Sequence, residues 1–309
     1  MKLVTPAADA ISRVGASAVL PKDFPSEAAD KYLASDVIQK AVAQGATWED
    51  TLDCGSPVEL SGSAPSALNL NSHNWAGYQY QGVEEPDYAY YLQSSMIWTI
   101  PAAVSTPSGG PDAVSIWPGV GTGDSEYDPL IQAGTQSYYY SGVPVTNAWF
   151  EVYPLDPYEI PLPSFPAGAG DDFGVVVTGH ATGIFLFTLC NYTANKCISA
   201  EEDRDAAHFS GQTVEWIVER PQYATGAYQQ LDPFGSLEIL GAEAAEMQGN
   251  GINWDSFYGG SVPLDPAVSI NKFTMTSCNG ATTLAHPGSF TGGGDFTVNW
   301  DDHGINESC

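Results

Sequence analysis

The chain has 309 residues, enough for one large domain or for a domain with an extension. It carries 37 acidic and 9 basic side chains, which gives a formal net charge of −28 at pH 7. This charge excludes nucleic-acid phosphate binding as a default function and disfavours binding to anionic membrane surfaces. Because ionised carboxylates repel one another, the charge fits a protein that works at acid pH. A halophilic surface and simple solubility are the alternative interpretations.

The sequence favours a secreted protein without a membrane anchor. No stretch approaches the ~20 apolar residues that a membrane-spanning helix needs. The N-terminus does not read as a signal peptide, because polar residues and a proline interrupt its short apolar stretch. The cysteines nevertheless favour export. Cys190 and Cys197 flank a short turn and could close a small loop, Cys278 could reach Cys309, and Cys54 is left over.

Residues 1–70 differ from the rest of the chain and predict an N-terminal prosegment with a linker. Ser26 can cap a helix over residues 28–41, with Glu27 in its first turn. Five of the nine basic residues lie in this section: Lys2, Arg13, Lys22, Lys31 and Lys40. A run rich in Ser, Pro and Gly follows at Ser56–Ser66. We therefore expect a helical prosegment that covers and inhibits an acidic domain at 71–309. A helix packed permanently on that domain is the alternative.

From Ser72 onward, short β-rich runs follow one another, separated by Gly, Pro, Asn and Asp. The runs are 75–80, 88–100, 113–117, 130–140, 148–153, 173–177, 184–189, 213–218, 237–240, 270–275 and 296–300. No long helical pattern interrupts them, and no internal repeat is present. Many short strands at this spacing predict an all-β fold, a single antiparallel β-sandwich or jelly roll.

One predicted strand, Thr213–Glu219, alternates between two kinds of face. Its apolar face is made by Val214, Trp216 and Val218, and its other face by Glu215, Ile217 and Glu219. Carboxylates that project from a rigid strand into a concavity suit general acid–base chemistry. An ordinary solvated strand face is the alternative.

Three further predicted strands place polar or indole side chains on one face. These faces are Gln132, Gly134 and Gln136; Asn147, Trp149, Glu151 and Tyr153; and Ser115 with Trp117. If the four strands are neighbours, they form a groove with aromatic walls and a few hydrogen-bonding groups, as binding clefts do.

Several common catalytic motifs are missing from the sequence. It contains no Gly-x-Ser-x-Gly, His-Glu-x-x-His or Cys-x-x-Cys motif, and no Asp-Thr-Gly or Asp-Ser-Gly. The five histidines are scattered. The sequence therefore predicts carboxylate chemistry with neither a metal nor a cofactor.

Five motifs between Asn74 and Trp300 resemble those of the glutamic peptidases (eqolisins) in order and in approximate spacing. They are Asn74-Trp75-Ala76-Gly77, Trp117-Pro118-Gly119, Ile131-Gln132-Ala133-Gly134, Ala148-Trp149-Phe150-Glu151-Val152-Tyr153-Pro154 and Glu215-Trp216-Ile217-Val218-Glu219. Five ordered motifs are much more specific than any one of them alone.

The resemblance implies a concanavalin A-like sandwich of two curved antiparallel sheets, made as a secreted proenzyme. It also implies a glutamine–glutamate dyad that cleaves peptide bonds at acid pH and is insensitive to pepstatin. The dyad falls on Gln132 and Glu219. The cleft tryptophans of the family fall on Trp75 and Trp117, its supporting glutamate and tyrosine fall on Glu151 and Tyr153, and Glu215 is expected to support the site.

The sequence also departs from the fungal members of the family. Gly121, Gln136 and Asn147 stand where those members have aspartates. Three carboxylates near the expected cleft are thus neutral, so the subsite preference and the pH profile are expected to differ.

The expected activity is that of an acid endopeptidase, monomeric and acting on proteins or peptides. An ionised Glu219 can take a proton from water and return it to the leaving amine, while Gln132 donates a hydrogen bond to the oxyanion. A jelly-roll glycoside hydrolase or carbohydrate-binding protein that uses Glu215 and Glu219 is the alternative, because long side chains could approach the ~5.5 Å of a retaining pair. The similar glucanases, however, have an aspartate at the position of Ile217.

Overall fold

The structure, a computed structural model, describes most of the chain from residue 67 onward. The described residues are 2–3, 67–81, 89–104, 112–123, 129–140, 142–156, 159–162, 164–179, 183–204, 209, 211–223, 225–248, 257–259, 269–290, 294–305 and 307–309. The predicted helix over residues 28–41, the linker and Cys54 lie outside these residues.

The described residues fold into strands of very different lengths. In chain order they are β1 (Lys2–Leu3), β2 (Leu68–Ser72), β3 (Trp75–Gln81), β4 (Ala89–Thr99), β5 (Asp112–Val120), β6 (Leu130–Tyr140), β7 (Val143–Tyr153), β8 (Ile160–Pro161), β9 (Asp172–Gly179), β10 (Ile184–Asn191), β11 (Lys196–Asp203), β12 (Thr213–Glu219), β13 (Gln230–Leu231), β14 (Ser236–Gln248), β15 (Phe257–Gly259), β16 (Ser269–Thr276), β17 (Thr283–Pro287) and β18 (Phe296–Trp300).

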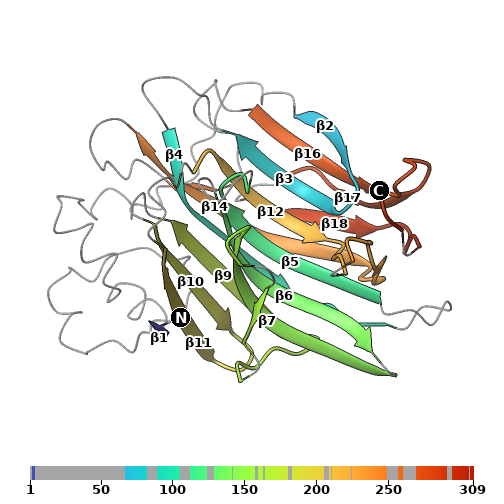
Figure 1. Ribbon diagram of the computed structural model, residues 1–309, viewed down its shortest axis with the longest axis horizontal. Helices are drawn as coiled ribbons and strands as arrows, with labels where there is room; N and C mark the ends of the chain where they lie inside the picture. Colours follow the sequence, from blue (N-terminus) through green and yellow to red (C-terminus); the bar gives the residue numbers. More distant parts are fainter. Residues whose placement is uncertain are drawn as a thin grey trace, which may run out of the picture.

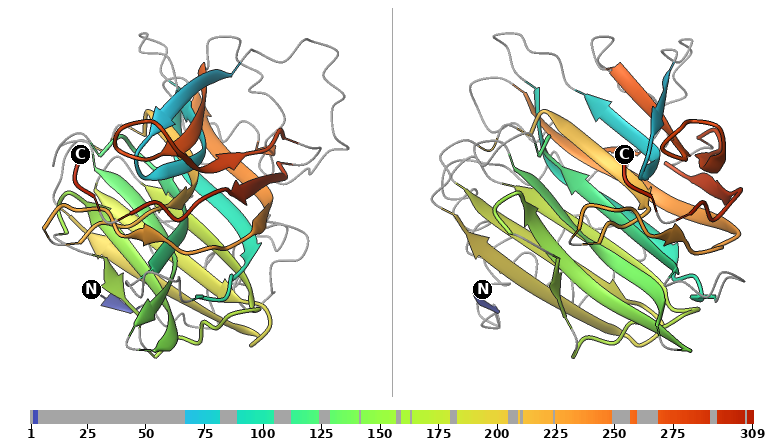
Figure 2. Two further views of the ribbon diagram at one scale, coloured as in Figure 1. Left: turned by 90° about the vertical axis from the view of Figure 1, so that its right-hand side faces the viewer. Right: turned by 45° about the vertical axis from the view of Figure 1, so that its right-hand side comes forward.

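The strands pair in one continuous path that folds over into two curved layers (Figures 1 and 2). The first layer runs β16, β3, β12, β5, β6, β7. The second runs β11, β10, β9, β4, β14, β18, and β17 connects β18 to β16. These pairings are all antiparallel, whereas β2 and β13 add parallel to β16 and β5. The all-β antiparallel fold predicted from the sequence is therefore confirmed.

The space between the layers is an apolar core rich in aromatic side chains. Val214, Trp216 and Val218 of β12 are completely buried in it, as their alternation predicted. The buried indoles also bridge the layers: Trp216 Nε1 donates a hydrogen bond to Ser95 O at 3.0 Å, and Trp98 Nε1 donates to Thr135 Oγ1 at 3.1 Å. The core thus holds the four strands of the expected groove on one rigid support.

The four strands predicted to carry the groove are consecutive neighbours in the first layer, in the order β12, β5, β6, β7. Across this layer Glu219 lies opposite Ser115, and Gly119 lies opposite Gln132, which lies opposite Glu151. The outer faces of the four strands therefore form one continuous surface, on the side away from the core.

Two disulfide bonds are present among the described residues. Cys190–Cys197 joins β10 to β11, and Cys278–Cys309 joins the chain after β16 to the C-terminus. Both pairings that the sequence allowed are confirmed. The part of the chain that the structure describes contains no helix long and apolar enough to cross a membrane.

Candidate active site

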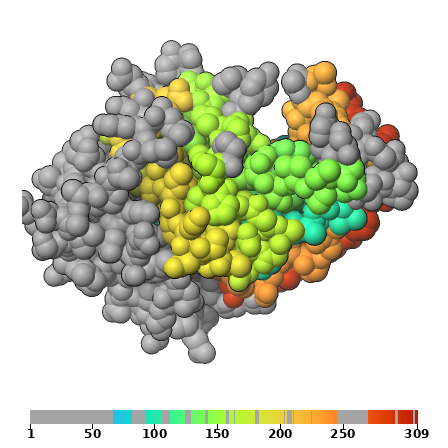
Figure 3. Space-filling view, turned by 90° about the horizontal axis from the view of Figure 1, so that it is seen from below, coloured from blue at the N-terminus to red at the C-terminus, as the bar shows by residue number. Residues whose placement is uncertain are grey.

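A cavity of about 760 Å³ lies on the outer face of the first layer. Seen from below, the surface is hollowed between the green atoms of β6 and β7 and an orange segment of the chain after β12 (Figure 3). The residues that line the cavity are Asn74, Trp75, Thr122, Gly123, Leu130, Gln132, Gln136, Glu151, Tyr153, Glu159, Glu219, Pro221, Gln222, Tyr223, Gly226 and Gln229. A second cavity of about 400 Å³ shares Gln136, Glu159, Tyr223 and Gln229 with the first.

Glu219, at the end of β12, is held by two hydrogen-bond donors. Trp117 Nε1 donates to its Oε2 at 2.7 Å, and Asn74 Nδ2 donates to its Oε1 at 3.0 Å. Burial raises the pKa of Glu219 to about 6, while the hydrogen bonds from Trp117 and Asn74 act in the opposite direction. The carboxyl group is thus fixed in position and changes its charge at mildly acid pH.

Gln132 is buried and oriented by its neighbour on β7. Its Nε2 donates a hydrogen bond to Glu151 Oε2 at 2.6 Å. Because an amide NH₂ carries two hydrogens, this bond leaves one N–H for a bound molecule. Burial raises the pKa of Glu151 to about 7, the bond from Gln132 lowers it, and the charges of Glu219 and Asp156 raise it.

The structure adds a third carboxyl group that the sequence analysis missed. Glu159 precedes β8 and lines both cavities, where Ser115 Oγ donates a hydrogen bond to its Oε1 at 3.3 Å. Burial, then the charges of Glu219 and Glu151, raise its pKa to about 8. Glu159 stands in an irregular segment between two prolines, where no alternating pattern marks it, so only the pairing of β8 with β7 places it in the site.

The other predicted site residues divide into two groups. Trp75 and Tyr153 line the main cavity with the dyad and Glu151. Trp117 and Glu215 do not line it and are completely buried beneath the surface. Trp117 contacts Trp75 edge-on, with ring centroids 5.3 Å apart, and Glu215 Oε1 accepts a hydrogen bond from Gln79 Nε2 at 3.0 Å. These two side chains therefore support the residues above them.

Two of the residues that replace family aspartates line the second cavity, and one of them, Gln136, also lines the main cavity with Gln132 and Glu219. Gln136 and Asn147 are opposite each other on β6 and β7 and both line the second cavity. Glu159 lines that cavity as well, so an acidic group remains in this region despite the two amides. Gly121 directly follows β5.

The site holds the groups for acid–base catalysis. A carboxyl group, Glu219, and an amide N–H donor, Gln132, face the same cavity. Among the described residues there is no group of three or more His, Cys, Asp or Glu side chains that could hold a metal ion. What the site offers is a positioned carboxyl group, Glu219, and a positioned hydrogen-bond donor, Gln132, beside two further buried carboxyl groups.

Comparisons with solved structures agree with the fold. The chain is similar to scytalido-glutamic peptidase, solved with a peptide-based transition-state analogue, at 18% identity over 74% of this chain and 98% of that chain, with a TM-score of 0.54. It is also similar to SCP-B, a member of the eqolisin family solved in complex with the tripeptide Ala-Ile-His, at 17% identity over 74% and 98%, with a TM-score of 0.51. No curated protein sequence matches the chain.

The family assignment comes from the sequence itself. Residues 73–283 match the Peptidase A4 family. This match covers more than half of the chain and contains Gln132, Glu219 and their hydrogen-bond partners. The resemblance inferred from the five motifs is thereby confirmed, and the chain belongs to the Peptidase A4 family, the glutamic endopeptidases.

Proposed function

We propose that the chain hydrolyses peptide bonds within proteins at acid pH, with Glu219 as the general base and acid and Gln132 as the oxyanion donor. The observation that carries the proposal is that both side chains line one cavity, and each is fixed there by a separate hydrogen-bond partner. A fixed pair of this kind lowers the reorganisation that the reaction requires.

The reaction proceeds in two proton transfers. The carboxylate of Glu219 takes a proton from a water molecule, whose oxygen attacks the carbonyl carbon of the peptide bond. The carbonyl oxygen becomes negatively charged and accepts a hydrogen bond from the remaining N–H of Gln132. Glu219 then gives its proton to the amide nitrogen, the C–N bond breaks, and the carboxylate is restored.

The order of the pKa values supports these roles. As the pH rises, Glu219 ionises first, near 6, whereas Glu151 and Glu159 have pKa values of about 7 and about 8. Because burial raises all three pKa values, the cavity carries little negative charge at acid pH. Ionisation of Glu151 or Glu159 would add negative charge, which disfavours the oxyanion. Ionisation of Glu151 would also strengthen the hydrogen bond that it accepts from Gln132.

The partners and the location of the protein follow from the same proposal. Proteins and peptides are the substrates, residues 1–70 contain an inhibitory prosegment, and the mature protein is a secreted monomer. Two disulfide bonds favour an oxidising compartment. Because β2 pairs with β16, we expect maturation to cleave the chain before Leu68.

The glycoside hydrolase alternative needs both Glu215 and Glu219 at the substrate. Glu215 is completely buried and does not line the cavity, so it is not placed to protonate or attack a sugar. No observation on the described residues favours this alternative over the peptidase.

A digestion assay tests the proposed function. The mature protein is incubated with a denatured protein between pH 3 and pH 7, with and without pepstatin, and in parallel with β-glucans. The proposal predicts internal cleavage of the protein at acid pH, equal in the presence of pepstatin, and no release of sugar. Cleavage of glucan, or the absence of proteolysis over the whole pH range, would overturn it.

A further inference from the structure

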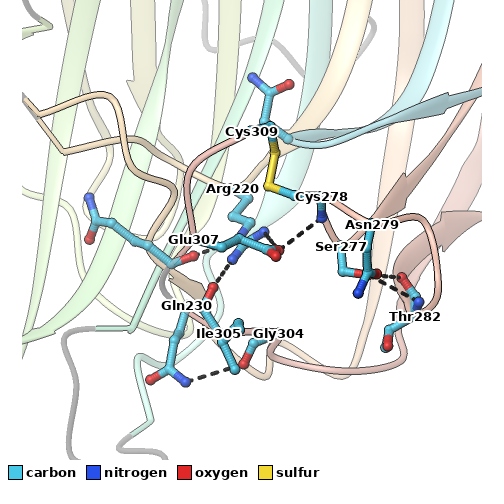
Figure 4. A network of polar contacts seen from close by, with 12 residues as sticks. Arg220, Gln230, Ser277, Cys278, Asn279, Thr282, Gly304, Ile305, Glu307 and Cys309 are labelled. Carbon is cyan, nitrogen blue, oxygen red and sulfur yellow. Dashed lines mark hydrogen bonds and ion pairs between the residues drawn. A yellow bond between two sulfur atoms is a disulfide. The ribbon is translucent and has the colours of Figure 1, made fainter.

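Arg220, which directly follows Glu219, is buried completely in a strongly acidic protein. A buried guanidinium is retained only where several acceptors surround it, because removing a charge from water is costly. Its side chain does not line the cavity and points toward the C-terminal tail, residues 303–305 and 307–309 (Figure 4).

The guanidinium group is held mainly by this tail. Nη1 forms an ion pair with Glu307 Oε1 at 2.9 Å, and Nη2 donates a hydrogen bond to the carbonyl oxygen of Ile305. The ring of Tyr228 lies over the guanidinium, with its centroid 5.4 Å from Cζ. Gly304, at a φ of +62°, lets the tail pass closely, because a Cβ there would lie 3.3 Å from Nη2.

The tail is in turn fastened to the body of the protein. The disulfide bond between Cys278 and Cys309 closes its end. The backbone N–H of Cys278 also donates to Glu307 Oε1 at 3.1 Å, so that one carboxylate oxygen joins Arg220 to the disulfide (Figure 4). Tyr228 N donates to Glu307 O at 2.7 Å.

Arg220 connects this tail to Asn74 and to the segment that begins at Pro221, both of which line the cavity. Its backbone N–H donates to Asn74 O at 2.8 Å, and the side chain of Asn74 holds Glu219 Oε1 at 3.0 Å. Its Nε donates to the carbonyl oxygen of Gln229, whose own N–H donates to Pro221 O at 2.9 Å. The segment that begins at Pro221 and ends at Gln229 contributes five residues to the lining of the cavity: Pro221, Gln222, Tyr223, Gly226 and Gln229.

We infer that Arg220 is a positioning residue, and that the C-terminal tail acts through it as a clasp that fixes Glu219 and the cavity wall formed by residues 221–223 and 225–229. The clasp consists of Arg220, Glu307 and the Cys278–Cys309 disulfide. It sets the geometry of the dyad and of the substrate-binding wall without touching the substrate. This inference rests on the proposed function.

Loosening the clasp has two kinetic consequences. The cavity wall becomes mobile, so KM rises and kcat falls, because misplacement of a reacting group by about 1 Å costs up to ~10²-fold. The hydrogen bond from Asn74, which lowers the pKa of Glu219, also weakens. The pKa of Glu219 therefore rises, and the acid limb of kcat/KM moves to higher pH.

The test uses the mature protein and a peptide that the parent cleaves, with kcat and KM measured from pH 3 to pH 8. The variants are Glu307→Gln and the double variant Cys278→Ser/Cys309→Ser, which both leave Arg220 in place, together with Arg220→Lys. Two controls match them. Asp301→Asn removes another carboxylate near the C-terminus, paired with His286 at 2.6 Å, and Cys190→Ser/Cys197→Ser removes the other disulfide. All assays are run well below the melting temperature of each variant.

We expect each clasp variant to lose about tenfold or more in kcat/KM, with a raised KM and an acid limb displaced to higher pH. The controls should keep both the parent values and the parent pH profile. A clasp that only stabilises the fold would lower the melting temperature and leave the kinetics unchanged, and that result would overturn the inference. If the parent cleaves no peptide, the proposed function fails instead, so the two failures are distinguishable.

Discussion

At the scale of single residues, the pKa of Glu219 depends on the hydrogen bond that it accepts from the indole of Trp117. Trp117→Phe keeps an aromatic ring at this buried position but removes the indole N–H, whose Nε1 lies 2.7 Å from Glu219 Oε2. Because this hydrogen bond favours the ionised carboxylate, its loss should raise the pKa of Glu219 by about one unit. The acid limb of kcat/KM should move upward from about pH 6 by the same amount. An unchanged limb in a folded variant would show that Trp117 does not tune the base.

Glu151 should control the other limb of the pH profile. With a pKa of about 7, it ionises just above Glu219 and then holds Gln132 more strongly. Glu151→Gln keeps an acceptor for Gln132 and removes this ionisation. The alkaline limb should therefore move from about 7 toward about 8, where Glu159 ionises. The exposed Glu238→Gln is the control, and an alkaline limb that stays in place in Glu151→Gln would exclude Glu151 as its source.

Sequence reasoning reached some of these residues and missed others for a physical reason. Gln132, Glu151 and Glu219 stand on strands, where alternation fixes the face of each side chain. Glu159 is in an irregular segment, and the side chain of Arg220 is bound by the C-terminal tail, more than 80 residues away in the sequence. No local pattern encodes such long-range contacts. They become visible only when the strands are paired.

At the scale of elements, the face of each groove strand was predictable, whereas the order of the strands was not. The alternation in β12 fixes which side chains enter the core, and the burial of Trp216 and Val218 agrees with it. Nothing in the local sequence shows that β12 lies between β3 and β5, or that β2 adds parallel to β16. Those pairings depend on the packing of the whole sandwich.

The close approach of β5 and β6 gives a prediction at this scale. A Cβ on Gly134 would lie 2.0 Å from the carbonyl oxygen of Ile116 and 2.9 Å from Trp117 Cβ, so Gly134→Ala must separate the two strands. We expect a loss of about 1–3 kcal/mol in the free energy of unfolding, together with reduced activity. Denaturant unfolding measures the first effect. Gly168→Ala, where the nearest atom is 3.4 Å away, is the control and should unfold like the parent.

At the scale of the whole molecule, stability should decrease as the pH rises. Burial raises the pKa of Asp232 to about 7. The hydrogen bond from the backbone of Val104 lowers this pKa, and the charge of Asp112 raises it further. The folded state therefore binds the proton more tightly than the unfolded state, in which the pKa is about 3.9. This stabilisation, on the order of 4 kcal/mol, is complete below about pH 4 and is lost as the pH rises through about 7.

Calorimetry at several pH values from 3 to 8 tests this dependence. The parent should melt at a lower temperature at pH 8 than at pH 4, and Asp232→Asn should melt with a weaker pH dependence because the titrating group is gone. The exposed Glu238→Gln should keep the slope of the parent. A melting temperature of the parent that rises from pH 4 to pH 8 would contradict this account.

The central claim is that Glu219 performs the proton transfers and that Glu215, four residues earlier on the same face of β12, does not. The most direct measurement is the kcat of Glu219→Gln and of Glu215→Gln on one peptide at mildly acid pH, after both variants are shown to fold. Glu219→Gln should lose ~10²–10⁴-fold in kcat, whereas Glu215→Gln should remain within about tenfold of the parent. A Glu219→Gln variant that turns over at close to the parent rate, or a larger loss in Glu215→Gln, would contradict the account.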